Sequence, residues 1–205
     1  MANLQIAVLG AGNIGGALGR KWGAAGHTIV FGLANPTGEK AQALKADLGE
    51  KAVIKTIAEA IQGAEVVVFA IPGKAMDATI TANAGALNGK LVIDVANRVG
   101  EPVFNSYATF ERVAPTVRYA RAFNTLGWEN YVDPTFAGGP ADLFYAAPED
   151  GHLTVEALIS DMGYHPVRLG DSDQADLVDS LLRLWFTLTR TYGRRFAFKI
   201  VTAQG

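Results

Sequence analysis

The stretch that decides the fold is residues 5–15, Gln-Ile-Ala-Val-Leu-Gly-Ala-Gly-Asn-Ile-Gly. It joins a short apolar run to three glycines, Gly10, Gly12 and Gly15, at the spacing G-x-G-x-x-G. In such a motif the first glycine permits a tight strand-to-helix turn, and the second lets the backbone approach a pyrophosphate. The third lets the helix pack closely on the strand. The spacing alone is a weak signal, so the surrounding residues decide its interpretation.

The residues after the glycines have the pattern that such a motif requires. We predict a helix over 13–25, ended by Gly26, and a second strand over 27–31. The start of that helix offers unpaired N–H groups and the positive end of its dipole to phosphates. The pattern therefore predicts dinucleotide binding. The expected contacts in this loop are Gly10, Ala11, Gly12, Asn13, Ile14 and Gly15.

Short, β-rich apolar runs alternate with helical patterns along the rest of the chain. Further strands are expected near 53–55, 65–70, 90–94, 116–120, 141–147 and 165–169, and further helices near 37–48, 155–162 and 173–192. Such alternation predicts an α/β fold, a Rossmann-like doubly wound and mostly parallel sheet. We expect a single NAD(P)-binding domain over 1–205. Its C-terminal α/β extension, about 121–205, is small and ends in a long helix.

The last helix carries a broad apolar stripe. Leu177, Leu181, Leu184, Trp185 and Leu188 recur at helical spacing, with Val178 and Leu182 beside them. Such a stripe is typical of core packing. Because it is broader than packing on one side requires, we also expect part of it to serve a homodimer.

Composition excludes several classes of function. The formal net charge is −2, so no basic footprint indicates nucleic acid or an anionic membrane as a partner. There is no cysteine, and the three histidines are widely separated, so we expect no metal site. No signal peptide and no membrane-length apolar run is recognised. We expect a cytoplasmic protein whose partner is a small-molecule co-substrate.

The choice of cofactor depends on the end of the second strand. NAD-specific domains usually place Asp or Glu ~20 residues past the glycine motif, where it binds the ribose hydroxyls. Here residues 31–35 read Phe-Gly-Leu-Ala-Asn, and the first acid is Glu39. No carboxylate would repel a 2′-phosphate, and Lys40 stands where it could reach one. The sequence favours NADPH and leaves NADH open. The contacts expected here are Leu33, Ala34 and Lys40.

The chain carries no recognisable acid–base constellation, and we assign no catalytic residue. Hydride transfer to a flavin-like ring fits that absence, because it needs proximity, orientation and exclusion of water more than a strong general acid. The site is expected in the crevice outside the carboxyl ends of the strands. The candidates there are Ala70, Ile71, Pro72, Asn97 and Asn124.

Five segments together resemble the small NADP oxidoreductases that depend on coenzyme F420, a deazaflavin. They are IAVLGAGNIGGALGRKWGAAGHTIVFG at 6–32, VVVFAIPGKAM at 66–76, LVIDVAN at 91–97, RAFNTLGWEN at 121–130 and LLRLWFTLTRTYGRRFAFKIV at 181–201. The same dinucleotide-binding module forms the cytosolic part of the STEAP metalloreductases. The resemblance implies reversible hydride transfer between NADPH and the deazaflavin or a flavin, commonly in a homodimer.

The chain departs from the family at two points. The family's Ser-Arg pair after the second strand is matched by Leu33-Ala34, which removes a charged hydrogen bond to the 2′-phosphate. Such a loss costs about 1.5–3 kcal/mol, or about one to two decades in affinity, so NADH stays an alternative. The family usually has a proline after the asparagine that matches Asn97, and this chain has Arg98 there. A positive charge at this position would favour an anionic acceptor.

Two other functions stay open. One is an NAD(P)H-dependent reductase of a small carbonyl or imine, in which Asn97 or Asn124 orients the substrate. The other is a non-catalytic dinucleotide-sensing module.

Overall fold

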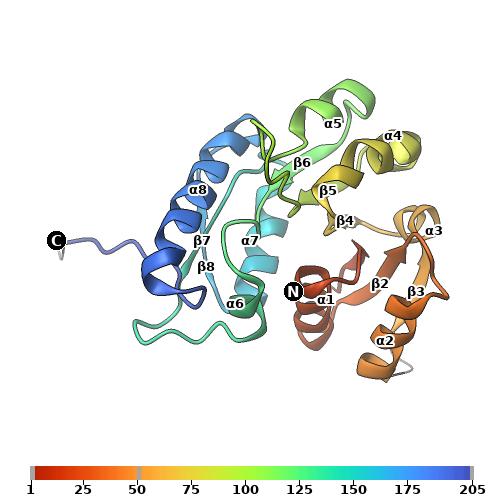
Figure 1. The fold of residues 1–205 in the computed structure, drawn as a ribbon. Helices are drawn as coiled ribbons and strands as arrows, with labels where there is room; N and C mark the ends of the chain where they lie inside the picture. Colours follow the sequence, from red (N-terminus) through yellow and green to blue (C-terminus); the bar gives the residue numbers. More distant parts are fainter. Residues whose placement is uncertain (1–2, 50–51, 204–205) are drawn as a thin grey trace.

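The computed structural model describes residues 3–49 and 52–203, and its centre is a six-stranded parallel sheet (Figure 1). The strands are β1 (Gln5–Leu9), β2 (Thr28–Leu33), β3 (Val53–Thr56), β4 (Val66–Phe69), β5 (Leu91–Asp94) and β6 (Arg118–Arg121). Their order is β3-β2-β1-β4-β5-β6, with every neighbouring pair parallel. This is the order of a dinucleotide-binding Rossmann sheet, and the predicted fold class is confirmed.

Helices cover both faces of this sheet, which explains why its central strands are continuously apolar. One face packs against α1 (Asn13–Ala24) and α2 (Glu39–Leu48), and the other against α3 (Ile57–Gln62), α4 (Met76–Leu87) and α5 (Tyr107–Val113). In β4, Val66 and Val68 face the first group while Val67 and Phe69 face the second. The short turn η2 (Gly73–Ala75) leads into α4.

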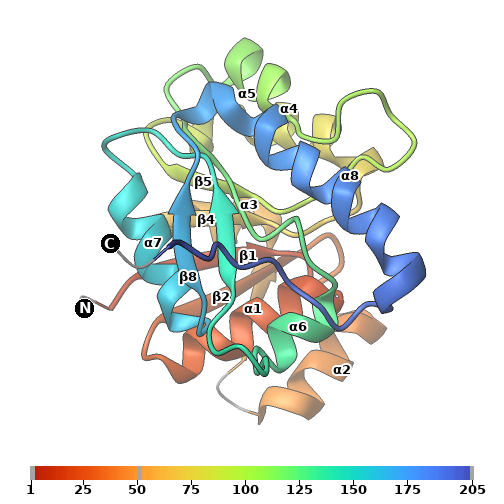
Figure 2. The same ribbon diagram turned by 90° about the vertical axis from the view of Figure 1, so that its left-hand side faces the viewer.

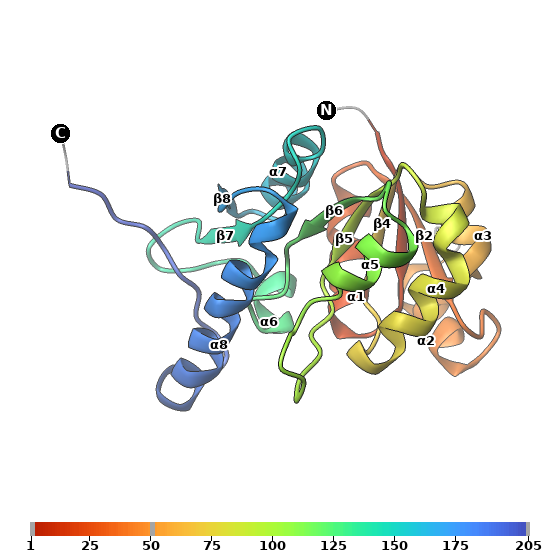
Figure 3. The same cartoon turned by 90° about the horizontal axis from the view of Figure 1, so that it is seen from above.

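The remaining elements form a smaller α/β unit beside the sheet (Figure 3). They are α6 (Trp128–Val132), β7 (Asp142–Tyr145), α7 (His152–Asp161), β8 (His165–Arg168), η3 (Ser172–Gln174) and α8 (Ala175–Tyr192). Strands β7 and β8 form a separate parallel pair, and an antiparallel bridge joins Arg121 to Ala146. This unit is docked on α1, where the Trp22 indole donates to the carbonyl of Leu158 at 2.9 Å.

Helix α8 runs across the front of the molecule in Figure 2, and its apolar stripe divides between core and surface. Val178, Leu182 and Trp185 are buried, whereas Leu177 and Leu184 are 48% and 46% exposed. The helix packs on one side only, and each residue turns about 100° around the axis, so the two leucines lie beside the contact rather than in it. The core role expected for the stripe therefore holds for part of it. Among the described residues, no helix is long and apolar enough to span a membrane.

Candidate functional site

The glycine loop is pressed against the end of β4. Gly10 has φ +102, and a Cβ there would lie 2.5 Å from the carbonyl oxygen of Ala70. A Cβ on Gly15 would lie 2.3 Å from the carbonyl oxygen of Gly10. Both spacings are far shorter than a normal contact, so only glycine fits. Two of the three glycines thus bring strand, loop and helix together, as the motif requires.

The third glycine leaves space for a ligand. Gly12 is the N-cap of α1, and no atom comes within 4 Å of a Cβ built there. No side chain in the described part of the chain caps this end of the helix. The first N–H groups of a helix have no partner inside it, so this end presents donors and a positive dipole to open space. A phosphate is the group that such a helix start accepts.

A cavity of about 790 Å³ runs along the carboxyl edge of the sheet from this loop. It is lined by eleven of the fourteen residues expected from the sequence, which are Gly10, Ala11, Gly12, Asn13, Ile14, Leu33, Ala34, Lys40, Ala70, Ile71 and Pro72. Gly15 lies buried beneath the loop. Asn97 and Asn124 lie outside the lining, in a polar network described below. The loops after β1, β2 and β4 therefore meet at one site, because parallel strands end at the same edge.

The end of β2 carries no acid. Leu33 is buried and Ala34 is exposed. The Asn35 side chain is used locally, since its Oδ1 accepts from the amide and the hydroxyl of Thr37 at 3.2 and 3.1 Å. At the start of α2, Glu39 and Lys40 both line the cavity and are exposed. Charges of both signs therefore stand at this end of the cavity.

Trp128 also lines the cavity, although it was not among the site residues predicted from the sequence. It begins α6, which packs beside α1, and it is half-buried. Its place seven residues after the end of β6 could have indicated this, because residues just beyond a strand's carboxyl end tend to reach the crevice.

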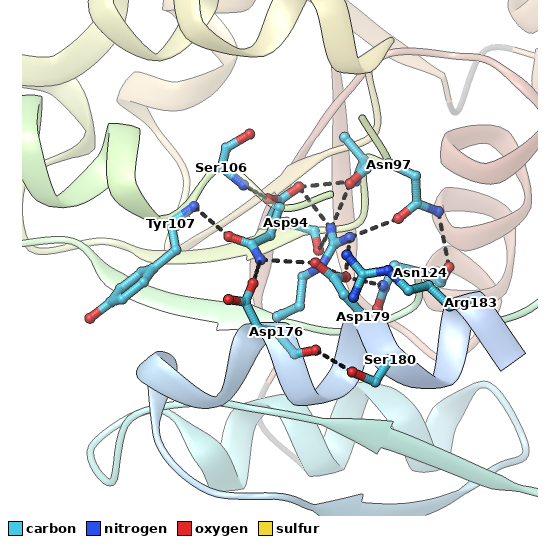
Figure 4. A network of polar contacts seen from close by, with 12 residues as sticks. Asp94, Asn97, Ser106, Tyr107, Asn124, Asp176, Asp179, Ser180 and Arg183 are labelled. Carbon is cyan, nitrogen blue, oxygen red and sulfur yellow. Dashed lines mark hydrogen bonds and ion pairs between the residues drawn. The ribbon is translucent and has the colours of Figure 1, made fainter. Parts of the chain in front are cut away.

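A buried polar network lies at the ends of β5 and β6 (Figure 4). Its centre is Arg121, which is fully buried with Asp94 and Asp179. Burial raises the pKa of the Asp94 carboxyl, and the charge of Arg121 opposes that rise. Asp94 also accepts from the hydroxyl of Tyr119 at 3.0 Å. Burial raises the pKa of that phenol well above its ordinary value, so it stays a donor.

The two asparagines belong to this network. Asn97 donates to the carbonyl of Asn124 at 3.0 Å and accepts from Arg121 at 2.7 Å. Asn124 donates to Asp179 at 2.9 Å and is 1% exposed. Both amide ends of Asn97 thus have protein partners.

Arg98 is occupied as well. Its guanidinium forms an ion pair with Asp77 on α4, and its side chain is 19% exposed. The hydrogen bond from Thr109, aided by Arg98, lowers the pKa of the Asp77 carboxyl. The charge that Arg98 adds to this loop is therefore balanced by a neighbouring helix.

Residues 5–98, which hold the glycine loop and the first five strands, match the family described as NADP oxidoreductase, coenzyme F420-dependent. The match covers a little under half of the chain, which over this segment is similar to that family. The resemblance and the enzyme class inferred from the sequence, an NAD(P)-dependent oxidoreductase, are thereby confirmed.

Solved structures agree over a longer span. A protein from Arthrobacter sp. FB24, whose name as an F420-dependent NADP reductase is provisional, is 25% identical to this chain. The match has a TM-score of 0.84 and covers 98% of this chain and 100% of that one. A hypothetical protein from Sinorhizobium meliloti is 26% identical, with a TM-score of 0.70 and coverage of 83% and 86%.

An imine reductase from Pseudomonas sp. shares the fold. It is 18% identical with a TM-score of 0.70, and the match covers 93% of this chain but 64% of that one. This chain thus resembles part of a longer reductase in backbone fold alone.

Proposed function

We propose that the protein transfers hydride between NADPH and a deazaflavin or flavin-type acceptor such as coenzyme F420. The observation that carries the proposal is the cavity at the carboxyl edge of the sheet. It joins the open glycine loop to the segment 70–72 and the indole of Trp128. A nicotinamide ring and a flat acceptor ring must stack with water excluded, and an apolar wall with an aromatic side chain suits that need.

The family match supports the acceptor by its description, and the Arthrobacter protein carries the same description. The residues present also fit the dinucleotide. The glycine loop and the start of α1 would hold the pyrophosphate, and Lys40 would hold the 2′-phosphate from α2. The dinucleotide would supply the hydride. What the chain's own residues do is bind, orient and exclude water.

The test is an anaerobic assay of the purified protein with oxidised coenzyme F420 and either NADPH or NADH. Loss of nicotinamide absorbance together with loss of deazaflavin absorbance is the expected result, faster with NADPH. If nucleotide binds but neither the deazaflavin nor a flavin is reduced, the proposed acceptor is wrong. Reduction of an imine or a carbonyl instead would assign the protein to the other class of reductase.

Cofactor preference has its own variant, Lys40→Ala. We expect it to raise the KM for NADPH about tenfold or more and to leave the KM for NADH unchanged, because only NADPH carries the 2′-phosphate. Lys45→Ala is the matched control, since Lys45 is exposed on the same helix and outside the cavity lining. Equal effects of the two variants on both cofactors would refute the assignment of Lys40.

We also propose a homodimer, supported by the exposed apolar residues of α8, among them Leu177, Leu184 and Phe186. Light scattering on the purified protein measures its mass directly, and a monomeric mass at assay concentration would refute this.

A further inference from the structure

The loops after β5 and β6 lie in the half of the sheet that should receive the nicotinamide. In a Rossmann sheet the dinucleotide crosses the point where the strand order reverses, here between β1 and β4. The adenosine half then lies over β1, β2 and β3, and the nicotinamide half lies over β4, β5 and β6. What fixes the loops after β5 and β6 therefore shapes the reacting end of the site.

The guanidinium of Arg121 bonds to the end of β5, to the loop that follows it and to α8. Its Nη1 donates to the backbone carbonyls of Asp94 at 3.1 Å and Ala96 at 2.6 Å. Its Nη2 donates to the Oδ1 of Asn97 at 2.7 Å. Nε and Nη2 both donate to the Oδ1 of Asp179, at 2.8 and 2.6 Å. One fully buried guanidinium thus ties the loop after β5 to a carboxylate on the C-terminal helix.

Asn97 connects Arg121 to the loop after β6. Its amide nitrogen donates to the carbonyl of Asn124, whose own side chain donates to Asp179. The residue before Asn124 is Phe123, whose φ of +56 is in the left-handed region that non-glycine residues rarely adopt. Such a conformation persists only where the surroundings hold it, and it recurs at ligand sites. Figure 4 shows Asn97, Asn124 and Asp179 drawn together from three separate elements.

We infer that Arg121 and Asp179 are positioning residues for the nicotinamide half of the dinucleotide, because they fix the loops after β5 and β6 through Asn97. A buried guanidinium must find acceptors for its five N–H groups, and apolar residues often replace buried ion pairs without loss of stability. Here three of the five bonds from Arg121 go to the segment 94–97. The inference rests on the proposed function, since it assumes that a nicotinamide dinucleotide occupies the cavity.

The variant that tests this is Asn97→Ala, which removes the link between the two loops and leaves the contact of Arg121 with Asp179 in place. Its affinity is measured for NADP⁺ and for 2′-phospho-ADP-ribose, which lacks the nicotinamide. We expect about a tenfold loss of affinity for NADP⁺ and less than about a twofold change for the fragment. In the assay kcat should fall more than the KM for nucleotide rises. A general folding defect would weaken both ligands alike.

Two further variants sharpen the test. Asn88→Ala removes an asparagine that accepts from Thr116 at the opposite edge of the sheet, and it should leave the affinity for both ligands unchanged. Arg121→Lys keeps the positive charge but cannot reach the loop carbonyls and Asp179 at once. It should therefore lower the affinity for NADP⁺ and leave the affinity for the fragment nearly unchanged, as in Asn97→Ala.

The outcomes separate the two proposals. Equal losses for both ligands, or none, in Asn97→Ala and Arg121→Lys would overturn the positioning role. If the unaltered protein binds neither ligand, both the proposed nucleotide site and this inference are refuted. If the variants lose affinity for NADP⁺ but not for the fragment, and coenzyme F420 is not turned over, the positioning role is supported and only the proposed acceptor is refuted.

Discussion

The two halves of the sheet edge are built by different means. Around β1 and β2 the site consists of backbone, and glycines at 10, 12 and 15 let chain segments approach one another or a ligand. Around β5 and β6 the site rests on charged side chains that meet from residues 94, 121 and 179. The first half presents donors to a phosphate without needing any particular neighbour. The second half keeps its shape only while a buried cation stays paired, so the two halves should fail in different ways.

The largest effect is expected from removing that cation. Arg121→Met leaves the carboxylates of Asp94 and Asp179 buried without their partner, and we expect the free energy of unfolding to fall by about 3–5 kcal/mol. Urea denaturation followed by circular dichroism measures it. The matched control is Arg20→Met, because Arg20 pairs with Asp47 between α1 and α2 with side chains 41% and 54% exposed. That pair should contribute less than about 1 kcal/mol. Similar losses in the two variants would remove the contrast between the halves.

A smaller change in stability, with a larger one in binding, is expected in the glycine half. Gly15→Ala places a methyl group 2.3 Å from a backbone oxygen that cannot move without shifting β1, so helix and strand must separate. We expect a loss of about 1–3 kcal/mol in stability and about a hundredfold or more in affinity for NADP⁺.

Gly85→Ala is the control for that variant. Gly85 lies inside α4 with no atom within 4 Å of an added Cβ. Alanine there should stabilise the protein by about 0.5–1 kcal/mol through helix propensity and leave binding unchanged. If calorimetry finds that Gly15→Ala binds NADP⁺ normally, the close approach of α1 is not needed for binding.

The sequence predicted the local half well. A strand, a glycine turn and a helix are encoded within residues 5–25, and apolar runs such as 66–69 mark strands buried on both faces. The end of β4 could also be placed in the site, because carboxyl ends of parallel strands share one edge. The helix α3 was missed because its six residues are too few to show a period. A signal was present there, since Thr56 and Glu59 form a capping box at its start.

The contacts of the half around β5 and β6 could not be predicted from sequence patterns. Asn97 and Asn124 were expected to face a ligand, but Asn124 donates to Asp179 on α8, and Asn97 bonds to Arg121 and to the carbonyl of Asn124. No local pattern can reveal these partners. The bond from Asn124 to Asp179 spans 55 positions of the chain, and that from Arg121 to Asp179 spans 58. Spacing of residue types predicts contacts within an element or between adjacent strands, whereas these depend on where a distant helix docks.

The smallest effect concerns the ion pair of Asp77 with Arg98, which joins the second half to α4. The lowered pKa of Asp77 means that the folded state favours its carboxylate, so its contribution is present above the ordinary value of 3.8. That contribution is lost as pH falls through the lower, folded pKa. Because the Asp77 side chain is 53% exposed, Asp77→Asn should cost less than about 1 kcal/mol near neutral pH.

The pH dependence distinguishes this origin from simple loss of packing. The free energies of unfolding of Asp77→Asn and the unaltered protein should differ near neutral pH and converge as pH falls from 3.8 through the lower pKa of the folded state, where the folded side chain becomes protonated. Asp150→Asn is the control, since Asp150 is exposed and its side chain has no ion pair among the described residues. A difference that stays constant with pH would mean that Asp77 acts through shape. The loop after β5 would then owe its position to the buried Arg121 alone, with no share from the charge on α4.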